Sequence, residues 1–363
     1  FMEIAVLGGG HGCYAAAADL SAAGHAVRFW RRDAAGFKPV LERGAVTVKD
    51  ADGRRDVRIP RPTLDLAEAV RGAALIVIPL PATAQAGLFG ALAPLLSDGQ
   101  VVFLPPGTMG SYLLVKAMRA AGNRAAVAAA ETGTLPWLCR KHGPAEVAIS
   151  VRATRLPTGV FPAKDRDRAL AVIKAAFPAV EPRDDALDGA LMNAGPIIHP
   201  PLILLNAGPL EHFEKWDIHN EGTQPSIRRV TDALDAERIA VREALGYGGY
   251  HFPLADHYRA DGPEWMYGRR SHKKLTDSGD WREKIDLTRH RYMLEDTELG
   301  LAFLVSCADY AGVAAPVARG LLALGSAING RDFRKTGRTL DGLGLAAFDR
   351  AGLRRHLHEG LAA

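Results

Sequence analysis

The sequence has few cysteines and no long uninterrupted apolar segment. Its three cysteines, Cys13, Cys139 and Cys307, lie far apart in a chain of 363 residues. An odd number at such distances forms neither a disulfide framework nor a metal-binding box. Apolar runs stay shorter than the roughly 18 residues of a membrane-spanning helix, and no charged-then-apolar leader precedes the first expected strand. We therefore expect a protein of the reducing cytoplasm, without a membrane span.

An excess of charge of one sign is also lacking. The formal net charge at pH 7 is +4, from 45 lysines and arginines against 41 aspartates and glutamates. The basic residues are dispersed rather than gathered in a stripe, so we expect small anionic ligands and no nucleic acid. The length favours two domains, each able to bury its own core.

The stretch MEIAVLGGGHGC, residues 2–13, leads an apolar β-type segment directly into a cluster of glycines, and a helix is expected from Tyr14. Such a loop lets a pyrophosphate approach the backbone at the start of a helix, where unpaired N–H groups and the helix dipole attract it. The pattern predicts a dinucleotide loop, and a flexible glycine turn is the alternative. Its cofactor-binding residues are Gly8 at the tight turn, Gly10 at the close approach, His11, Gly12, and Cys13 as the small third position.

The end of the second expected strand, residues 26–30, bears on the choice of cofactor. An acidic residue there would bind the adenosine ribose and favour NAD, whereas an arginine accommodates the 2′-phosphate of NADP. This chain has Arg31 and Arg32, followed by Asp33. The sequence therefore favours NADP, with Arg31 as a cofactor-binding residue. The alternative is a pair of surface arginines beside a strand that uses NAD.

Further strands alternate with helices up to about residue 183, which predicts a doubly wound, mostly parallel sheet. Asp52-Gly53 separates two short β-type runs and predicts a hairpin inserted into this pattern. Pro79, Pro81 and Gly107 lie in loops that follow strands, at the edge where dinucleotides bind. The expected strands lie at residues 74–80, 101–104, 125–130, 147–152 and 179–183, and the expected helices at 83–96, 112–121 and 166–177.

β-Type runs disappear after about Asp188, and helical patterns take their place. We expect a Rossmann NAD(P)-binding domain over residues 1–186 and an all-α substrate domain over 187–363. The apolar segment 191–210 holds four prolines, so a helix through it must kink. Residues 248–284 are polar and include a basic run at 269–274, which predicts a loop or lid whose charges are solvated or clamp a substrate. Helices are expected at 225–246, 289–310 and 316–328.

His199 lies in the apolar segment just after the expected boundary. A histidine exchanges protons near neutral pH, as a carbonyl or imine reduction requires, and from the residues alone a buried structural histidine is as good an interpretation. Glu295 and Asp296 are candidate carboxylate partners. Arg291 and Asp296 differ by about 140° around an α-helix, so both could border a cleft without sharing one face. Solvated charges at a helix start are the alternative.

The order of motifs resembles that of the octopine/nopaline dehydrogenase family, from Met2 to about Ala327. The resemblance implies reduction by NAD(P)H of an imine that forms from an α-keto acid and the amine of an amino acid. It further implies His199 as the catalytic acid/base, Asp296 as its orienting partner, and Arg291 as the clamp of a substrate carboxylate. The motifs are VLGGGHG, PPGTMGS, ETGTLPWLCR (131–140), NAGPIIHPP (193–201), the helix at 221–246 and RYMLED (291–296).

Some positions depart from the family pattern. His11 stands where asparagine is common, Cys13 where glycine or another small residue is frequent, and Arg31 where several NAD-using members have an acidic or neutral residue. The last departure again favours NADP over NAD. Residues 248–284 match no family pattern, so the amine stays open, as does the keto acid. A homodimer is compatible with this superfamily.

Two other functions fit the same fold. One is an NADP-dependent reductase of a simple ketone, of the 2-ketoacid, ketopantoate or glycerol-phosphate type; such enzymes commonly use a lysine where this chain has His199. The other is a dinucleotide-sensing protein without catalysis. An opine dehydrogenase requires an amine for NADPH oxidation, whereas a ketone reductase does not. A dinucleotide-sensing protein would show no oxidation at all.

Overall fold

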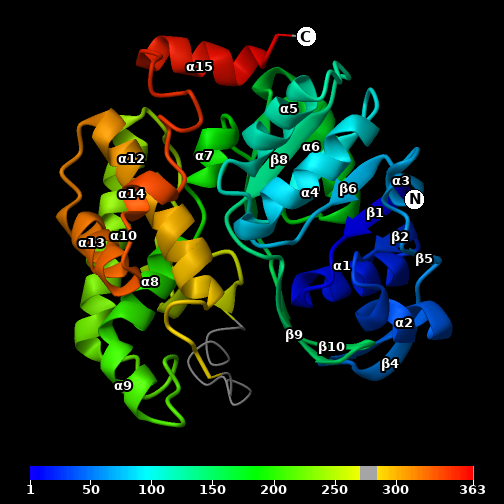
Figure 1. Ribbon diagram of the computed structural model, residues 1–363, viewed down its shortest axis with the longest axis horizontal. Helices are drawn as coiled ribbons and strands as arrows, with labels where there is room; N and C mark the ends of the chain where they lie inside the picture. Colours follow the sequence, from blue (N-terminus) through cyan, green and yellow to red (C-terminus); the bar gives the residue numbers. More distant parts are fainter. Residues whose placement is uncertain (270–283, 363) are drawn as a thin grey trace. The chain divides into compact units, whose positions relative to one another are not determined.

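The computed structural model describes residues 1–269 and 284–362 (Figure 1). The chain divides into two compact units, residues 1–190 together with 356–363, and residues 191–355. We call them unit 1 and unit 2. None of the described helices combines the length and the apolarity that crossing a membrane requires.

The expectation of a doubly wound sheet is confirmed in unit 1. Eight strands follow the order β12-β11-β8-β7-β6-β1-β2-β5, and every neighbouring pair is parallel except β8 and β11. The strands are β1 (Glu3–Leu7), β2 (Ala26–Trp30), β5 (Arg61–Thr63), β6 (Leu75–Val77), β7 (Val101–Leu104), β8 (Ala128–Thr132), β11 (Leu156–Phe161) and β12 (Val180–Pro182).

Both faces of this sheet are covered by helices. Along β1, Ile4 and Val6 belong to the apolar core on one face, and Ala5 and Leu7 to the core on the other. This alternation follows from the two-residue period of a strand, and it explains why β1 is apolar throughout. The helices are α1 (His11–Ala22), α2 (Ala34–Arg43), α3 (Leu66–Val70), α4 (Gln85–Leu92), α5 (Gly110–Ala120), α6 (Arg166–Ala176) and α7 (Ala186–Ala190).

A second sheet of four strands, in the order β4-β3-β10-β9, corrects one expectation. The predicted hairpin forms it in part: β3 (Ala45–Asp50) and β4 (Gly53–Arg58) pair antiparallel. β10 (Glu146–Arg152), which we expected in the main sheet, instead pairs with β3 and with β9 (Trp137–Gly143). The expectation was wrong because an apolar periodicity identifies a strand but not its neighbours. The place in the main sheet belongs to β11, which the sequence analysis missed.

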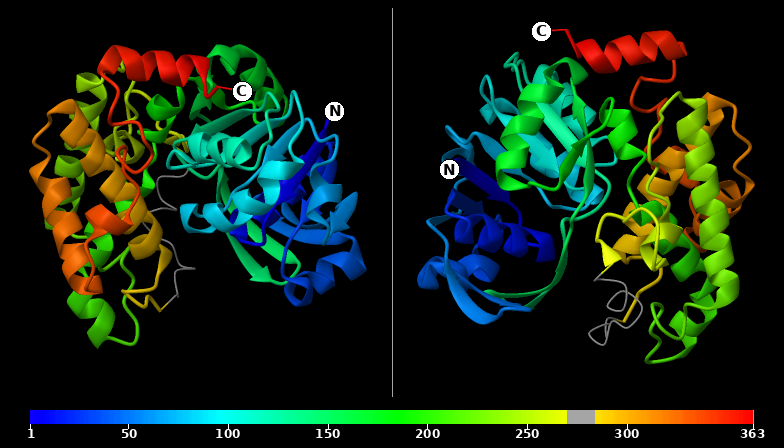
Figure 2. Two further views of the ribbon diagram at one scale, coloured as in Figure 1. Left: turned by 45° about the horizontal axis from the view of Figure 1, so that its top comes forward. Right: turned by 180° about the vertical axis from the view of Figure 1, so that it is seen from behind.

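Helix α1 is enclosed by strands of both sheets, and Figure 2 shows the second sheet curving around it. The residues from Gly12 to Ala18 are all buried. A helix with two covered sides has no solvent face and needs small apolar residues all round, which is why the sequence reads CYAAAA there. α1 begins at His11, three residues earlier than expected.

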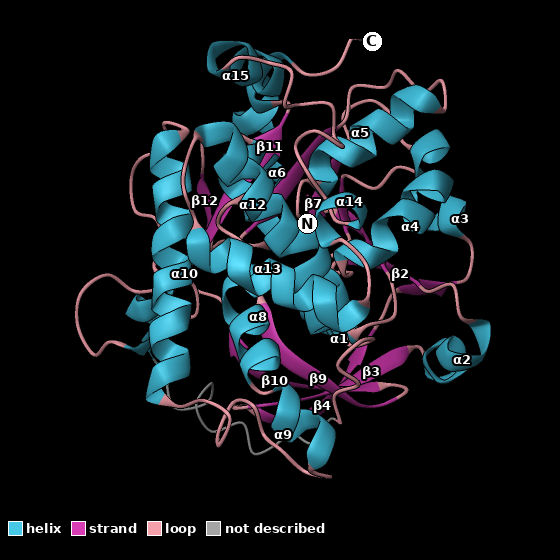
Figure 3. Ribbon diagram, turned by 60° about the vertical axis from the view of Figure 1, so that its left-hand side comes forward, coloured by secondary structure: helices cyan, strands magenta, loops and turns pink. Residues whose placement is uncertain are grey.

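The described part of unit 2 is helical. Figure 3 shows α10 (Pro225–Ala244) running along α8 (Gly195–Leu205) and α13 (Pro316–Asn329), with which it is in contact. The expected kink is a break: α8 contains Pro200 and Pro201 and ends before Asn206, where α9 (Ala207–His212) begins. The other helices of unit 2 are a 3-10 helix at Leu254–Tyr258, a π-helix at Tyr292–Leu301, α12 (Ala302–Ala311) and α14 (Phe333–Thr336). The last helix, α15 (Arg350–Glu359), begins in unit 2 and ends in unit 1.

The single α-helix expected over 289–310 is wrong in its first half. Tyr292–Leu301 is a π-helix, and the N–H of Ala302 donates to the carbonyl of Thr297, five residues back. A π-helix has more residues per turn than an α-helix, so residues five apart lie closer in angle around its axis. The 140° separation inferred for Arg291 and Asp296 therefore does not apply.

Two other expectations differ from the structure or fall outside it. The helix expected over 83–96 is divided into a 3-10 turn at Ala82–Ala84, α4, and a second 3-10 turn at Ala93–Leu95. Most of the basic run at 269–274, in the expected loop or lid, lies outside the described residues.

Candidate active site

His199 and Asp296 meet in unit 2, on α8 and on the π-helix that packs against it. The Nδ1 atom of His199 lies 2.7 Å from Oδ2 of Asp296. The histidine side chain is 20% exposed and that of the aspartate 8%. Because Nδ1 is engaged, Nε2 is the histidine atom that remains for a reacting molecule.

The imidazole of His199 also lies flat on a tyrosine. The ring centroids of His199 and Tyr292 are 3.6 Å apart with an angle of 8° between the planes. The guanidinium of Arg291 lies 5.4 Å from the same tyrosine ring centroid. Contacts on Nδ1 and on one face thus fix the imidazole, and the sequence analysis missed the stacking role of Tyr292.

Burial and the charge of Arg291 set the protonation of this pair. Burial raises the pKa of Asp296 to about 7, although the nearby Arg291 acts in the opposite direction. Burial, and then the charge of Arg291, lower the pKa of His199 well below its ordinary value. Both shifts disfavour charge, so near neutral pH the pair tends to hold one proton on its hydrogen bond.

Two glycines let the two helices approach closely enough for this contact. A Cβ atom on Gly195 would lie 2.3 Å from Oδ1 of Asp296, and one on Gly300 would lie 2.4 Å from Cγ of Pro196. Neither distance is compatible with a side chain. Because Gly195 and Gly300 have no side chains, the two helices can pack closely enough for His199 to contact Asp296.

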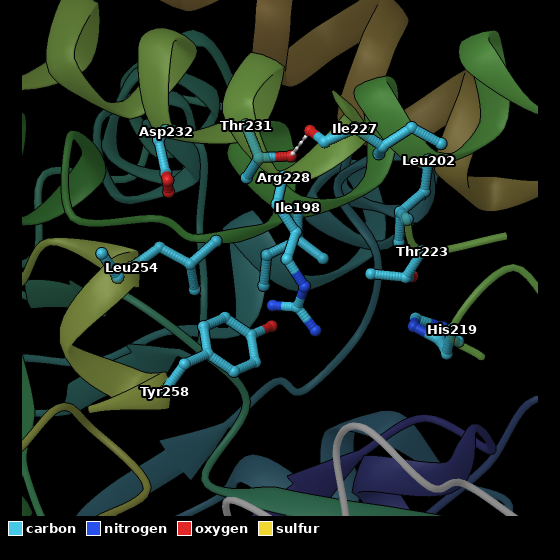
Figure 4. Close-up of a pocket in the computed structure, with 11 residues that line it drawn as sticks. Ile198, Leu202, His219, Thr223, Ile227, Arg228, Thr231, Asp232, Leu254 and Tyr258 are labelled. Carbon is cyan, nitrogen blue, oxygen red and sulfur yellow. Dashed lines mark hydrogen bonds between the residues drawn. The ribbon is translucent and has the colours of Figure 1, made fainter. Parts of the chain in front are cut away.

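Unit 2 also holds a pocket of about 230 Å³, whose lining side chains are drawn in Figure 4. Ile198, the residue before His199, and His219 both line it. The His219 ring meets Tyr292 edge-on, with centroids 6.4 Å apart. Ile198 and His219 thus connect the pocket with the stacked rings of His199 and Tyr292.

In unit 1 the glycine loop has the conformation that the sequence predicted. Gly8 has a φ of +123°, which disfavours residues with a side chain. Gly10 is the N-cap of α1, and a Cβ atom there would meet no protein atom within 4 Å. Gly12 is held against Leu135, whose Cδ1 would lie 2.7 Å from a Cβ. The loop leaves its open space at Gly10, where a pyrophosphate would approach.

Cys13, Pro81 and Gly107, which are also predicted to bind the cofactor, lie in α1 and after strands β6 and β7. The buried thiol of Cys13 lies 3.6 Å from the carbonyls of Leu7 and Pro79, and burial raises its pKa to about 12, so it is a packing residue and not a nucleophile. Pro81 directly precedes the 3-10 turn after β6. Gly107 follows β7, and a Cβ there would lie 2.8 Å from Cβ of Glu131, so part of its role is close packing.

Two cations approach the loop from different strands. Arg31 donates to the hydroxyl of Tyr14 and to the carbonyl of Gly36, both at 3.1 Å. Lys141, on β9, donates from Nζ to the carbonyl of Gly9 at 3.1 Å, and its Nζ lies 4.3 Å from the ring centroid of Tyr14. Burial and then the charge of Arg31 lower the pKa of Lys141. Sequence reasoning missed Lys141, because 132 residues separate it from Gly9.

His11 connects β9 to the same loop. Its Nδ1 accepts a hydrogen bond of 2.8 Å from the backbone N–H of Lys141. His11, which stands where the family commonly has asparagine, thus joins the second sheet to the first turn of α1.

Comparison with known proteins agrees with these features. Residues 182–329 match the model of the "NAD/NADP octopine/nopaline dehydrogenase, alpha-helical domain". The opine dehydrogenase of Arthrobacter sp. (strain 1C) is 29% identical over 358 residues, which cover 96% of this chain and 97% of that protein. The Protein ocs of Agrobacterium tumefaciens (strain Ach5) is 25% identical over 94% of this chain and 95% of its own length.

Solved structures share the fold. A structure of octopine dehydrogenase in complex with NADH and agmatine matches with a TM-score of 0.72 at 19% identity, and the match covers 100% of this chain and 99% of that one. Yersinopine dehydrogenase with NADP⁺ bound matches with a TM-score of 0.66 at 16% identity, over 99% and 98% of the two chains. A 2-dehydropantoate 2-reductase from Geobacter metallireducens has a TM-score of 0.59 at 15% identity, over 90% of this chain and 99% of that one.

Proposed function

This chain belongs to the octopine/nopaline dehydrogenase family and is an NAD(P)-dependent oxidoreductase, and from this premise we propose that it joins an α-keto acid to an amino acid. The amine condenses with the keto group and loses water to give an imine. Hydride addition to the imine carbon and proton addition to its nitrogen then give a secondary amine with two carboxylates. The contact that carries this proposal is the 2.7 Å hydrogen bond between His199 and Asp296.

In this proposal His199 is the acid/base, acting through Nε2. Asp296 holds the ring orientation through Nδ1 and stabilises the imidazolium when it forms. The stacked Tyr292, 3.6 Å away, limits rotation of the ring. Together these contacts aim Nε2 at one position, so that a proton can be exchanged with a bound substrate there.

Arg291 would bind a carboxylate of the substrate with its planar guanidinium. Its charge lowers the pKa of His199 while no anion is bound. A carboxylate on Arg291 would offset that charge and raise the pKa of His199. The histidine would then take up its proton when a substrate is present, which couples binding to the acid that the reduction needs.

The glycine loop fits a dinucleotide. Its open space at Gly10 lies at the start of α1, where backbone N–H groups attract a pyrophosphate. When bound, the reduced nicotinamide supplies the hydride. Arg31, at the end of β2, and Lys141 provide two positive charges near Gly9, which supports binding of a 2′-phosphate and so NADP in preference to NAD.

A screen of α-keto acids crossed with amino acids, followed by NADPH and NADH oxidation with mass analysis of products, tests this function. We expect oxidation that requires both substrates and a product mass equal to their sum, less water, plus two hydrogens. Oxidation with a keto acid alone would instead identify a ketone reductase.

The boundary at 186/187, a homodimer and a cytoplasmic location stay predictions from the sequence.

A further inference from the structure

The pocket beside His199 has apolar walls and one central cation. Leu202 of α8, Ile227 of α10 and Leu254 of the 3-10 helix supply apolar side chains. The guanidinium of Arg228 points into the space between them, beside the ring of Tyr258 (Figure 4). Its volume of about 230 Å³ is smaller than the roughly 300–1,000 Å³ of pockets for drug-sized ligands, and suits a small metabolite.

In the described part of the chain, no carboxylate lies close enough to the Arg228 guanidinium to form an ion pair. Its guanidinium carbon lies 4.6 Å from the ring centroid of Tyr258. Asp235, which lies on the same helix, is engaged by Arg238 at 2.6 Å. Arg228 also forms a side-chain hydrogen bond with Tyr258. A partly buried guanidinium that an aromatic residue holds in place, and that has no ion pair, is suited to binding a carboxylate.

Asp232 gives the pocket a second pole. It follows Arg228 by one turn of α10 and also lines the pocket. Burial, and then the neighbouring Asp235, raise its pKa, while Arg228 lowers it. A carboxylate near Asp232 would be repelled, so the pocket accepts an anionic group only at Arg228.

We propose that this pocket binds the amino-acid substrate, with its α-carboxylate on Arg228 and an uncharged side chain along Leu202, Ile227 and Leu254. This assignment rests on the proposed function. The product of that reaction carries two carboxylates, and Arg291 accounts for only one of them. Two residues of the pocket adjoin the acid/base: Ile198 precedes His199 in the chain, and His219 contacts the Tyr292 ring that stacks on His199. Arg228 is thus a specificity residue that selects amino acids over simple amines.

The test compares L-leucine with 3-methylbutylamine, the same molecule without its carboxylate, with pyruvate and NADPH as co-substrates. In Arg228→Gln we expect the KM for L-leucine to rise about 10- to 100-fold, the usual effect of losing a charged hydrogen bond. The KM values for 3-methylbutylamine and pyruvate should stay unchanged. Arg228→Lys should recover part of the affinity, and thermal unfolding of each variant shows whether it folds.

Arg229→Gln is the matched control, because Arg229 is the exposed neighbour and bonds only to Ser226 in the described residues. An equal rise in KM for L-leucine and for 3-methylbutylamine in Arg228→Gln would overturn the proposal, as would an effect no larger than in Arg229→Gln. Turnover of glutamate but not of L-leucine by the unaltered enzyme would overturn it too. If no pair of keto acid and amine is turned over, it is the proposed function that fails.

Discussion

The Nδ1 atom of His199 lies 2.7 Å from Oδ2 of Asp296, although the two residues are 97 positions apart in the sequence. Proximity and burial leave Nε2 as the free end of an oriented imidazole. A partly exposed histidine beside a carboxylate of raised pKa supports the proposed acid/base over a buried structural histidine, the alternative open from the sequence. The arrangement matches the histidine–carboxylate unit of general acid–base catalysts.

We predict that His199→Ala lowers kcat by about 10²- to 10⁴-fold, the usual contribution of a general acid or base. The dissociation constant for NADPH should not change, because no residue of the glycine loop is altered. His212→Ala, at an exposed histidine on α9, is the control. Steady-state kinetics and cofactor fluorescence titration give the two quantities, and undiminished turnover would remove His199 from the mechanism.

Asp296→Asn should change how stability depends on pH. The pKa of Asp296 rises from 3.8 to about 7 on burial, so the folded protein binds more protons at this group than the unfolded protein does. Its contribution to the free energy of unfolding is therefore present below pH 4 and is lost as pH rises through about 7. The lowered pKa of His199 acts oppositely, but only below about pH 6.5.

The asparagine variant should consequently gain stability relative to the unaltered protein between about pH 4 and 7, by an amount on the order of a few kcal/mol. Urea unfolding at several pH values measures this difference. A difference that is constant over the range would show that Asp296 does not titrate there.

Gly10→Ala is expected to separate cofactor binding from folding. Gly10 has an extended backbone, with φ of −79°, and a methyl group there meets no protein atom, so the fold should tolerate it. The methyl would occupy the space where the pyrophosphate approaches, and the NADPH dissociation constant should rise about tenfold or more. Gly8→Ala should instead lower the melting temperature, since φ is +123° and Leu80 lies 2.5 Å from the new Cβ. Unchanged NADPH affinity in Gly10→Ala would contradict the loop assignment.

Lys141→Met should weaken NADPH binding roughly tenfold and leave NADH binding unchanged, because the lysine charge would contact only the 2′-phosphate. Lys174→Met is the control, since Lys174 is an exposed lysine in the last turn of α6. Fluorescence titrations with both cofactors measure the effect. Equal losses for NADPH and NADH would move Lys141 to the pyrophosphate, and no loss for either would exclude it from the cofactor site.

Local signals in the sequence predicted much of the fold. The apolar period of β1, the Asp52-Gly53 hairpin and the proline-broken segment before Asn206 each follow from interactions among near neighbours in the chain. The neighbours of β10 and the approach of Lys141 to Gly9 were not predicted, because they are contacts between distant segments. Arg228 was not predicted as a site residue for the same reason. The sequence around it indicates a helix, but it does not indicate the pocket that this helix lines.

The π-helix was missed because the spacing of Arg291 and Asp296 was interpreted with the period of an α-helix. Nothing local in RYMLED distinguishes the two helix types. Packing does: Gly300 on the π-helix faces Pro196 on α8, and Gly195 on α8 faces Asp296. The π-helix therefore occurs where it packs closely against α8, a helix about a hundred residues earlier in the chain. Such a contact between distant segments leaves no local signal in the sequence.

Gly300→Ala tests whether this close approach sustains the His199–Asp296 pair. The new Cβ would lie 2.4 Å from Cγ of Pro196, and a proline ring within a helix cannot turn away. The two helices would have to separate. Because His199 and Asp296 lie on these two helices, the separation would lengthen their 2.7 Å hydrogen bond. We expect a loss of about 1–3 kcal/mol in the free energy of unfolding and a fall in kcat.

Gly320→Ala, on α13, is the matched control because its Cβ would meet no atom within 4 Å. That variant should be unchanged or slightly more stable, since alanine favours a helix interior over glycine. A Gly300→Ala enzyme that loses stability but keeps its kcat would show that the His199–Asp296 hydrogen bond does not depend on the spacing of the two helices. A joint loss would link the π-helix directly to the orientation of the acid/base.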